Sequence, residues 1–231
     1  MTRVRRPLGC HLYLAAGALA TVLYCAIPPF KGSGFLINLI GLSAVVAVIV
    51  GLRRNRPTST LPWWLFALGL VLFWLGDLYT YSYPKLFHQE VPFPSIGDGL
   101  HLAVYPALMA GLVILHRRRS PDYDQAGLID ALIMTLGLAL LEWVDLIAPN
   151  LHAEGMSLFG HTVSVAYPLG DILLLAAAVR LLMDAGKRPP AFYLLTSSVV
   201  LLLVTDYVHG LVLLHAQDTH PFWLDVGWIG F

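Results

Sequence analysis

Residues 93–108 read "FPSIGDGLHLAVYPAL", a largely apolar stretch that nevertheless carries polar side chains at regular spacing. Asp98, His101 and Tyr105 recur at i, i+3 and i+7, which places them on one face of an α-helix. We expect this face to point into a helix bundle and away from lipid. Pro106 predicts a kink, which neighbouring helices tolerate in a membrane because they satisfy the freed carbonyl.

The composition of the whole chain predicts a membrane protein. Of its 231 residues, 58% are hydrophobic and 12% charged, and the mean hydropathy is +0.72. A soluble domain averages about 25% charged residues, so this chain has too little polar surface to cover a globule in water. We therefore predict an all-α, polytopic transmembrane helix bundle whose main partner is the lipid bilayer.

Apolar runs long enough to cross a bilayer divide the chain into about eight spans. They cover residues 9–28, 34–52, 61–81, 96–116, 127–147, 162–183 and 192–214, and an eighth run begins near residue 222 and is truncated by the chain end. We expect two parts, an N-terminal helix pair with a basic linker (1–60) and a repeat-like membrane bundle (61–231).

The distribution of basic residues predicts the orientation. With a cytoplasmic N-terminus, only Lys31 and Lys85 of the 14 Lys and Arg residues would lie outside. The cytoplasmic group would contain Arg3, Arg5, Arg6, Arg53, Arg54, Arg56, Arg117, Arg118, Arg119, Arg180, Lys187 and Arg188. This bias follows the positive-inside rule.

A weak repeat relates the later spans as three helical hairpins. The segments "LFWLGDLYTY", "LLEWVDLIAP" and "LLLVTDYVHG" align Asp77, Asp145 and Asp206 near the outer ends of three helices. In the returning helices Asp98 aligns with Asp225, and the Tyr-Pro pair at 105–106 aligns with the one at 167–168.

Polar groups inside the spans are the candidate site, because intramembrane carboxylates are costly and mark function. The candidates for binding a ligand or a proton are Asp77, Asp98, His101, Tyr105, Glu142, Asp145, Asp171, Asp206, His209 and Asp225. Asp171 and Asp206 lie deepest, each about 13 Å from the outer end by helical rise. We expect their partners among His209, Tyr167, Ser197, Ser198 and Thr205.

Simpler roles compete with this interpretation. Asp98 follows Gly97 at a helix start, where a carboxylate also serves as a cap, and Asp77 could equally meet water at the interface. Tyr79, Tyr81 and Tyr83 fit an interfacial aromatic belt. No HxxxH or HxxE pair occurs on a span, so no metal site is expected; nucleotide-binding and catalytic motifs are also absent from the sequence, so no cofactor and no catalytic residue is expected.

Three longer stretches resemble a known family. "FPSIGDGLHLAVYPALMAGLVIL", "LIDALIMTLGLALLEWVDLIAP" and "AYPLGDILLLAAAVRLL" are similar to the multi-spanning N-terminal sensory region of actinobacterial-type GGDEF and EAL proteins. The resemblance runs from about residue 61 to the end, and it implies a bacterial cell-membrane domain that regulates cyclic di-GMP synthesis or hydrolysis. The GGDEF and EAL signatures themselves are absent from these residues.

Three functions remain open at this stage. The first is a signal-input domain that controls a cytoplasmic output domain, in cis or in trans; a homodimer is left open, and no nucleic-acid partner is expected. The second is a small-solute or proton-coupled transporter, which mid-membrane carboxylates also suit. The third is an intramembrane metal-binding protein.

Overall fold

The computed structural model describes residues 8–26, 33–119, 125–183, 188–215 and 222–231. In these ranges the chain is helical, with no strand. The basic residues Arg3, Arg5, Arg6, Lys31 and Lys187, on which the predicted orientation partly rests, lie outside them. The all-α prediction is confirmed.

The helices follow the predicted spans closely. Their bounds are α1 (Leu8–Ala26), α2 (Ser33–Asn55), α3 (Leu61–Phe87), α4 (Ile96–Arg119), α5 (Gln125–Glu142), α6 (Ala148–Leu151), α7 (Leu158–Leu182), α8 (Pro190–His215) and α9 (Asp225–Gly230). A π-helical turn (Trp143–Ile147) joins α5 to α6, and a 3-10 turn (Phe222–Leu224) precedes α9. Seven helical segments in the described ranges are long and apolar enough to cross a membrane. The chain is therefore a polytopic membrane bundle.

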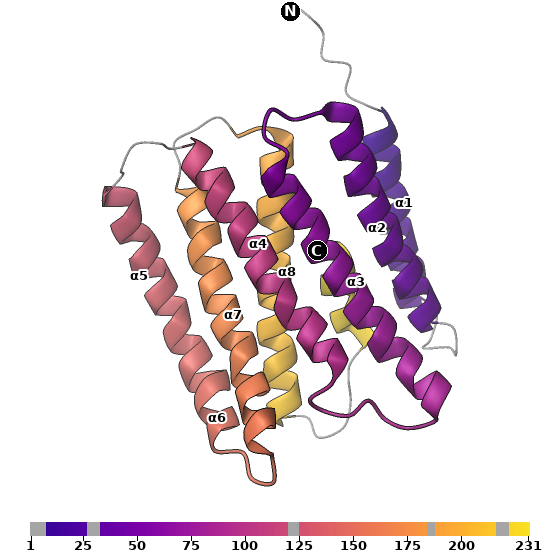
Figure 1. Ribbon diagram of the computed structural model, residues 1–231, viewed down its shortest axis with the longest axis vertical. Helices are drawn as coiled ribbons and strands as arrows, with labels where there is room; N and C mark the ends of the chain where they lie inside the picture. The colour runs from indigo at the N-terminus through magenta and orange to yellow at the C-terminus, as the bar shows by residue number, and fades with distance from the viewer. Residues whose placement is uncertain (1–7, 27–32, 120–124, 184–187, 216–221) are drawn as a thin grey trace, which may run out of the picture.

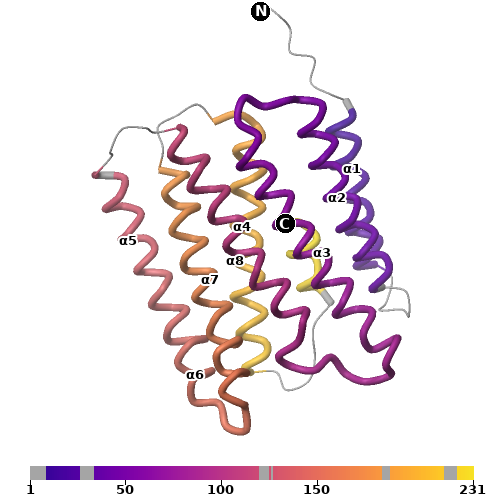
Figure 2. Tube along the Cα trace, in the orientation of Figure 1, coloured from indigo at the N-terminus to yellow at the C-terminus, as the bar shows by residue number. Residues whose placement is uncertain are grey.

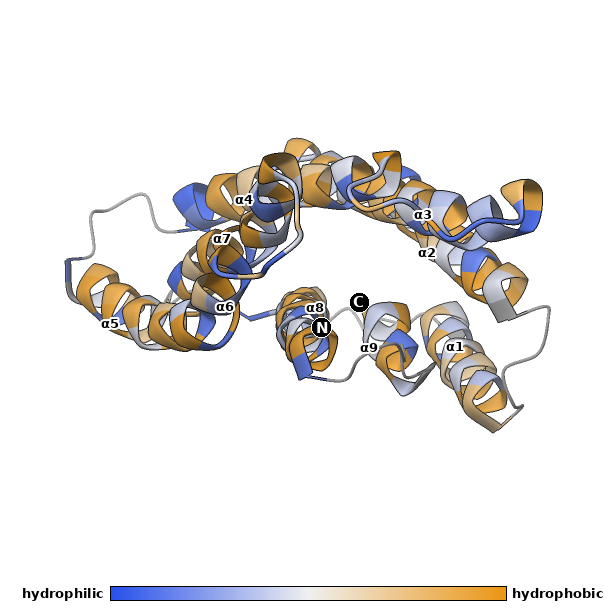
Figure 3. Cartoon of the chain, turned by 90° about the horizontal axis from the view of Figure 1, so that it is seen from below, coloured by the Kyte–Doolittle hydropathy of each residue, from blue (hydrophilic) through white to orange (hydrophobic). Residues whose placement is uncertain are grey.

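The long helices run up and down the bundle and stand in two rows. Seen along the bundle, α7, α4, α3 and α2 form one row, and α5, α8, α9 and α1 form the other (Figures 1 and 3). The eighth predicted run is the short helix α9, which lies between α8 and α1, and the chain ends at mid-height (Figures 2 and 3). Because α9 contacts α8, α1 and α2, it packs as part of the bundle, with Asp225 buried.

The core lies where α3, α4, α7 and α8 meet. Val104 and Leu108 of α4 pack there with Leu174 of α7 and Val199 of α8, each at most 2% exposed. By contrast, many large apolar side chains on α1, α2 and α5 are exposed. A soluble protein would bury such side chains, whereas a membrane protein presents them to lipid.

The two ends of the bundle differ in charge. Arg119 ends α4, and its guanidinium lies 4.5 Å from the centre of the Phe192 ring, while that of Arg188 lies 5.8 Å from the same ring. The C-terminal end of α4 and the N-terminal end of α8 lie at the upper end of the bundle in Figure 1. We call the half of the bundle that carries the α3–α4 and α6–α7 connections the lower half. The candidate site residues lie in the lower half and around mid-height.

Candidate functional site

The site begins where α4 begins, with a reciprocal cap. Ser95 precedes the helix, and its backbone N–H and Oγ donate to Asp98 Oδ2 at 2.7 and 2.8 Å, while Ser95 Oγ lies 3.4 Å from the Asp98 backbone N–H. This is the capping-box arrangement, in which each residue satisfies the other. The other oxygen of Asp98 accepts a hydrogen bond from Tyr167 of α7 at 3.0 Å. The carboxylate therefore both caps α4 and ties it to α7.

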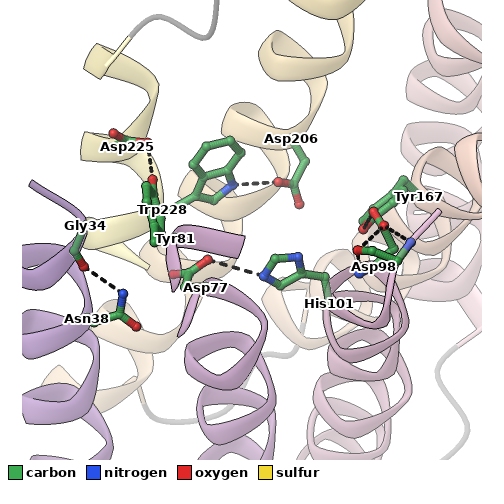
Figure 4. Close-up of polar contacts among 11 residues, drawn as sticks. Gly34, Asn38, Asp77, Tyr81, Asp98, His101, Tyr167, Asp206, Asp225 and Trp228 are labelled. Atoms are coloured by element: carbon green, nitrogen blue, oxygen red, sulfur yellow. Dashed lines mark hydrogen bonds and ion pairs between the residues drawn. The ribbon is translucent and has the colours of Figure 1, made fainter. Parts of the chain in front are cut away.

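The next turns of the same face reach two further helices. The Nε2 atom of His101 lies 3.3 Å from Asp77 Oδ1 on α3, and both side chains are 22% exposed. Figure 4 shows the imidazole of His101 directed across to Asp77. The predicted inward face of α4 is confirmed, since Asp98, His101 and Tyr105 all bond to side chains of other helices.

Tyr105 occupies the centre of the site. Its hydroxyl donates to Asp171 Oδ1 of α7 at 2.9 Å and lies 3.2 Å from Asp206 Oδ2 of α8. Tyr105 is 6% exposed and Asp171 is 4% exposed. By helical rise Asp171 lies about 20 Å from the start of α7, deeper than the sequence predicted because α7 begins at Leu158. One phenol thus joins three helices around two carboxyl groups.

Two glycines make these contacts sterically feasible. A Cβ atom on Gly76 would lie 2.3 Å from His101 Nε2, and one on Gly170 would lie 2.8 Å from Tyr105 Cγ. Each glycine directly precedes the aspartate that the neighbouring ring bonds. The missing side chain lets the imidazole and the phenol pass the helix backbone and reach the carboxylates of Asp77 and Asp171.

Helix α9 completes the site from the other row. The indole Nε1 of Trp228 donates to Asp206 Oδ1 at 2.8 Å (Figure 4). Asp225, at the start of α9, accepts hydrogen bonds from Tyr24 of α1 and from Tyr81 of α3, the latter at 3.1 Å. The position of α9 is therefore defined by polar contacts on both sides, to α8 on one side and to α1 and α3 on the other.

The contacts support the weak repeat in two of the three hairpins. Trp228 follows Asp225 by three positions, as His101 follows Asp98. Trp228 bonds Asp206 just as His101 bonds Asp77. In the third hairpin Asp145 instead accepts a hydrogen bond from Tyr207 of α8 at 2.5 Å.

Asp145 and Glu142 extend the polar region towards α5. Asp145 lies in the π-helical turn, a feature frequent at functional sites. Glu142 is 9% exposed, and its Oε2 atom has no hydrogen-bond partner in the described part of the chain. Its carboxylate lies within electrostatic range of Asp206, Asp145 and Asp171. A buried oxygen in this state is an acceptor that lacks a donor.

A small cavity lies on the opposite side of Asp206, between α2, α3 and α9. Its volume is about 60 Å³, and its wall includes Asp77, Tyr81, Asp225 and Trp228 alongside apolar residues of α2. Trp228 forms part of this wall and also bonds Asp206, so it connects the cavity wall to the central carboxyl pair.

The structure corrects several predicted partners. Ser197, Ser198 and Thr205 bond carbonyls of their own helix, and Tyr167 bonds Asp98. The ring of His209 stacks edge-on against Trp228 with centroids 5.0 Å apart. The hydroxyl of Tyr105 contacts both Asp171 and Asp206, and the indole of Trp228 donates to Asp206.

Sequence reasoning missed four site residues, namely Tyr24, Tyr81, Tyr207 and Trp228. Tyr81 was assigned to the aromatic belt, whereas its hydroxyl points inward to Asp225 (Figure 4). The Gly-Asp pairs at 76–77 and 170–171 were an available signal, since a small residue beside a buried carboxylate leaves room for a bulky partner.

Two further observations bear on the class of protein. Among the described residues, no group of three or more His, Cys, Asp or Glu side chains is arranged to hold a metal ion. Comparison with protein-family models, with curated proteins and with solved structures finds no match to this chain.

Proposed function

We propose that this chain is a membrane signal-input domain, in which a ligand or protons act on the buried carboxylate network and shift helix packing. The bundle would lie in a bacterial cell membrane with its N-terminus in the cytoplasm. It would control a cytoplasmic output domain, in cis or in trans, of the diguanylate cyclase or phosphodiesterase type.

The observation that carries this proposal is the Tyr105 hydroxyl, which lies within hydrogen-bond distance of carboxyl oxygens on α7 and α8. A change in the charge of Asp171 or Asp206, or binding of a ligand to either, would alter the hydrogen bonds that join α4, α7 and α8. A conformational switch needs two helix packings that differ in their affinity for the signal. The single hydroxyl of Tyr105 can donate its hydrogen either to Asp171 on α7 or to Asp206 on α8.

The contacts between this site and α9 support the same proposal. Trp228 bonds Asp206 directly, and α9 also packs on α8 through Gly227, whose Cβ position lies against Thr205. Movement of Asp206 would therefore be transmitted to α9 without intervening loops. The mechanical link runs through side chains that are in contact.

The proposal is tested by measuring cyclic di-GMP in cells that carry the gene with Asp206→Asn or Asp98→Asn. We expect either substitution to change the response of cyclic di-GMP to external pH or to candidate ligands, with normal membrane insertion. Asp130→Asn is the matched control, because Asp130 lies exposed on α5 away from the network. If the two site variants respond like wild type while their expression is normal, the network is structural and the sensor proposal fails.

A proton-coupled transporter is the second candidate, and the observation that favours it is the carboxyl pair around mid-height near a cavity whose wall includes Asp77 and Asp225. Such groups serve as proton relays in carriers. Purified protein in liposomes with an internal pH dye distinguishes the two. Solute-driven proton movement that Asp206→Asn abolishes would favour transport over signalling.

A further inference from the structure

The central cluster poses a question of hydrogen counting. The oxygen of Tyr105 lies 2.9 Å from Asp171 Oδ1 and 3.2 Å from Asp206 Oδ2, both within hydrogen-bond distance. A phenol carries one hydrogen and can donate it to one carboxylate, whereas an ionised carboxylate is an acceptor and supplies none. With both carboxyl groups ionised, one contact of this triad would pair two oxygen acceptors with no hydrogen between them.

The surroundings make that arrangement unfavourable. Asp171 is 4% exposed and Tyr105 is 6% exposed, and Asp206 is partly buried, so water screens the two carboxylates from each other only weakly. No Lys or Arg in the described ranges forms an ion pair with Asp171 or Asp206. Two carboxylates that share one buried site repel, and the ordinary resolution is that one of them holds a proton.

We propose that Asp171, Tyr105 and Asp206 form a proton-binding site in which one carboxyl group is protonated and donates to the phenol oxygen while the phenol donates to the other carboxylate. The proton comes from hydronium, which leaves as water, and the new O–H bond forms on a carboxylate oxygen. Loss of the proton reverses this step. This inference rests on the proposed function, and it names the proton as the signal that the site takes.

The groups that face the triad are known from each packed helix. They are His101 of α4, Glu142 of α5, Tyr167 of α7, His209 of α8, and Asp77 on α3 and Asp225 on α9 beyond them. Acidic side chains outnumber basic ones in this set, and His101 already pairs with Asp77. The field around the triad therefore favours an added positive charge.

Glu142 is an independent sign that a proton belongs here. Its side chain is nine-tenths buried, its Oε2 atom lacks a hydrogen-bond partner, and it lies within electrostatic range of both Asp171 and Asp206. A buried carboxylate with an empty acceptor position adds to the repulsion within the triad.

The cavity between α2, α3 and α9 gives the proton a polar approach. Its volume of about 60 Å³ and its polar wall residues Asp77, Tyr81 and Asp225 suit ordered water. Asp77 joins this cavity to His101, and His101 lies within electrostatic range of Asp206. Asp77 and His101 are thus ionisable groups that lead from the cavity wall towards the triad.

Infrared difference spectroscopy of the purified full chain in lipid nanodiscs tests the proposal. We expect the carbonyl stretch of one protonated carboxyl group at neutral pH, lost when the sample is made alkaline. Asp171→Asn and Asp206→Asn should each remove this band, and Tyr105→Phe should shift it. The matched control is Tyr13→Phe, which removes a phenol that bonds Ser43 at an exposed position on α1 and should leave the band in place.

The outcomes separate the proton site from the wider function. Absence of a protonated carboxyl band in wild type, or a band that survives both Asp171→Asn and Asp206→Asn, overturns the proton site, whatever cyclic di-GMP does. The wild-type measurement decides this even if a variant fails to fold. A band that behaves as expected, together with cyclic di-GMP levels that do not change with pH, keeps the proton site and refutes the proton as the signal of the sensor.

Discussion

Replacement of Gly76 by alanine tests how the site is built, because the added methyl group would collide with His101. The Cβ atom would lie 2.3 Å from Nε2, whereas ordinary contacts begin at 3.4 Å. The imidazole must therefore move by at least about 1 Å. The Nε2–Oδ1 distance to Asp77 is already 3.3 Å, so the displaced ring loses this bond.

The expected cost follows from the lost contact. Hydrogen bonds to charged groups contribute about 1.5–3 kcal/mol, and replacing glycine by alanine in a helix returns about 0.5–1 kcal/mol. Gly76→Ala should therefore lower the free energy of unfolding by about 1–2 kcal/mol. Gly99→Ala is the matched control, because a Cβ there meets no atom within 4 Å; it should be neutral or slightly stabilising.

Unfolding of the purified chain in mixed micelles, followed by circular dichroism, measures both variants. A double-mutant cycle with His101→Ala then isolates the cause. If the methyl group acts through the imidazole, Gly76→Ala should cost little once His101 is alanine. A cost that persists in the His101→Ala background, or equal stability of the Gly76 and Gly99 variants, would refute the steric argument.

Three further predictions concern the N-terminal cap of α4, the packing of α9 against α8, and the orientation of the chain in the membrane. Ser95→Ala should lower the free energy of unfolding by about 0.5–2 kcal/mol through loss of the cap, with Ser95→Thr close to wild type; equal losses in both variants would contradict the capping role. Gly227→Ala should cost about 1–3 kcal/mol by overpacking, since its Cβ would lie 1.9 Å from Thr205 Oγ1, and Thr205→Ala should relieve most of that cost in the same unfolding assay. In a cysteine-free background, a membrane-impermeant thiol reagent applied to intact cells should label Glu154→Cys and spare Arg118→Cys; the opposite pattern would reverse the orientation.

The helices were predictable from the sequence because the bilayer imposes a simple rule. A spanning segment must satisfy its own backbone and present apolar side chains, so length and composition suffice to locate it. The inward face of α4 was predictable for a related reason, since Asp98, His101 and Tyr105 follow helical periodicity. The capping role considered for Asp98 also appears in the structure, in its reciprocal form with Ser95.

The partners of the buried carboxylates were not predictable in the same way. Periodicity states which side of a helix a residue occupies, but it does not state which helix stands opposite. Tyr81 illustrates the difference, because its position near a span end suits a lipid interface. Only the position of α9 in the bundle brings Asp225 within hydrogen-bond distance of the Tyr81 hydroxyl. The π-helical turn around Asp145 was equally hidden, since the turn Trp143–Ile147 contains no glycine or proline that would mark a departure from the α-helix.

The sequence by itself determined that this chain is an all-α bundle of membrane-spanning helices with polar residues concentrated towards one end. Those features follow from local composition and helical period, which each segment carries alone. Only the tertiary structure decided that Tyr105 lies between Asp171 and Asp206. It also decided that Gly76 and Gly170 leave space for the rings of His101 and Tyr105 beside the helix backbone. Such contacts depend on how three or more helices pack together, and the energy that selects that packing is shared among residues far apart in the chain.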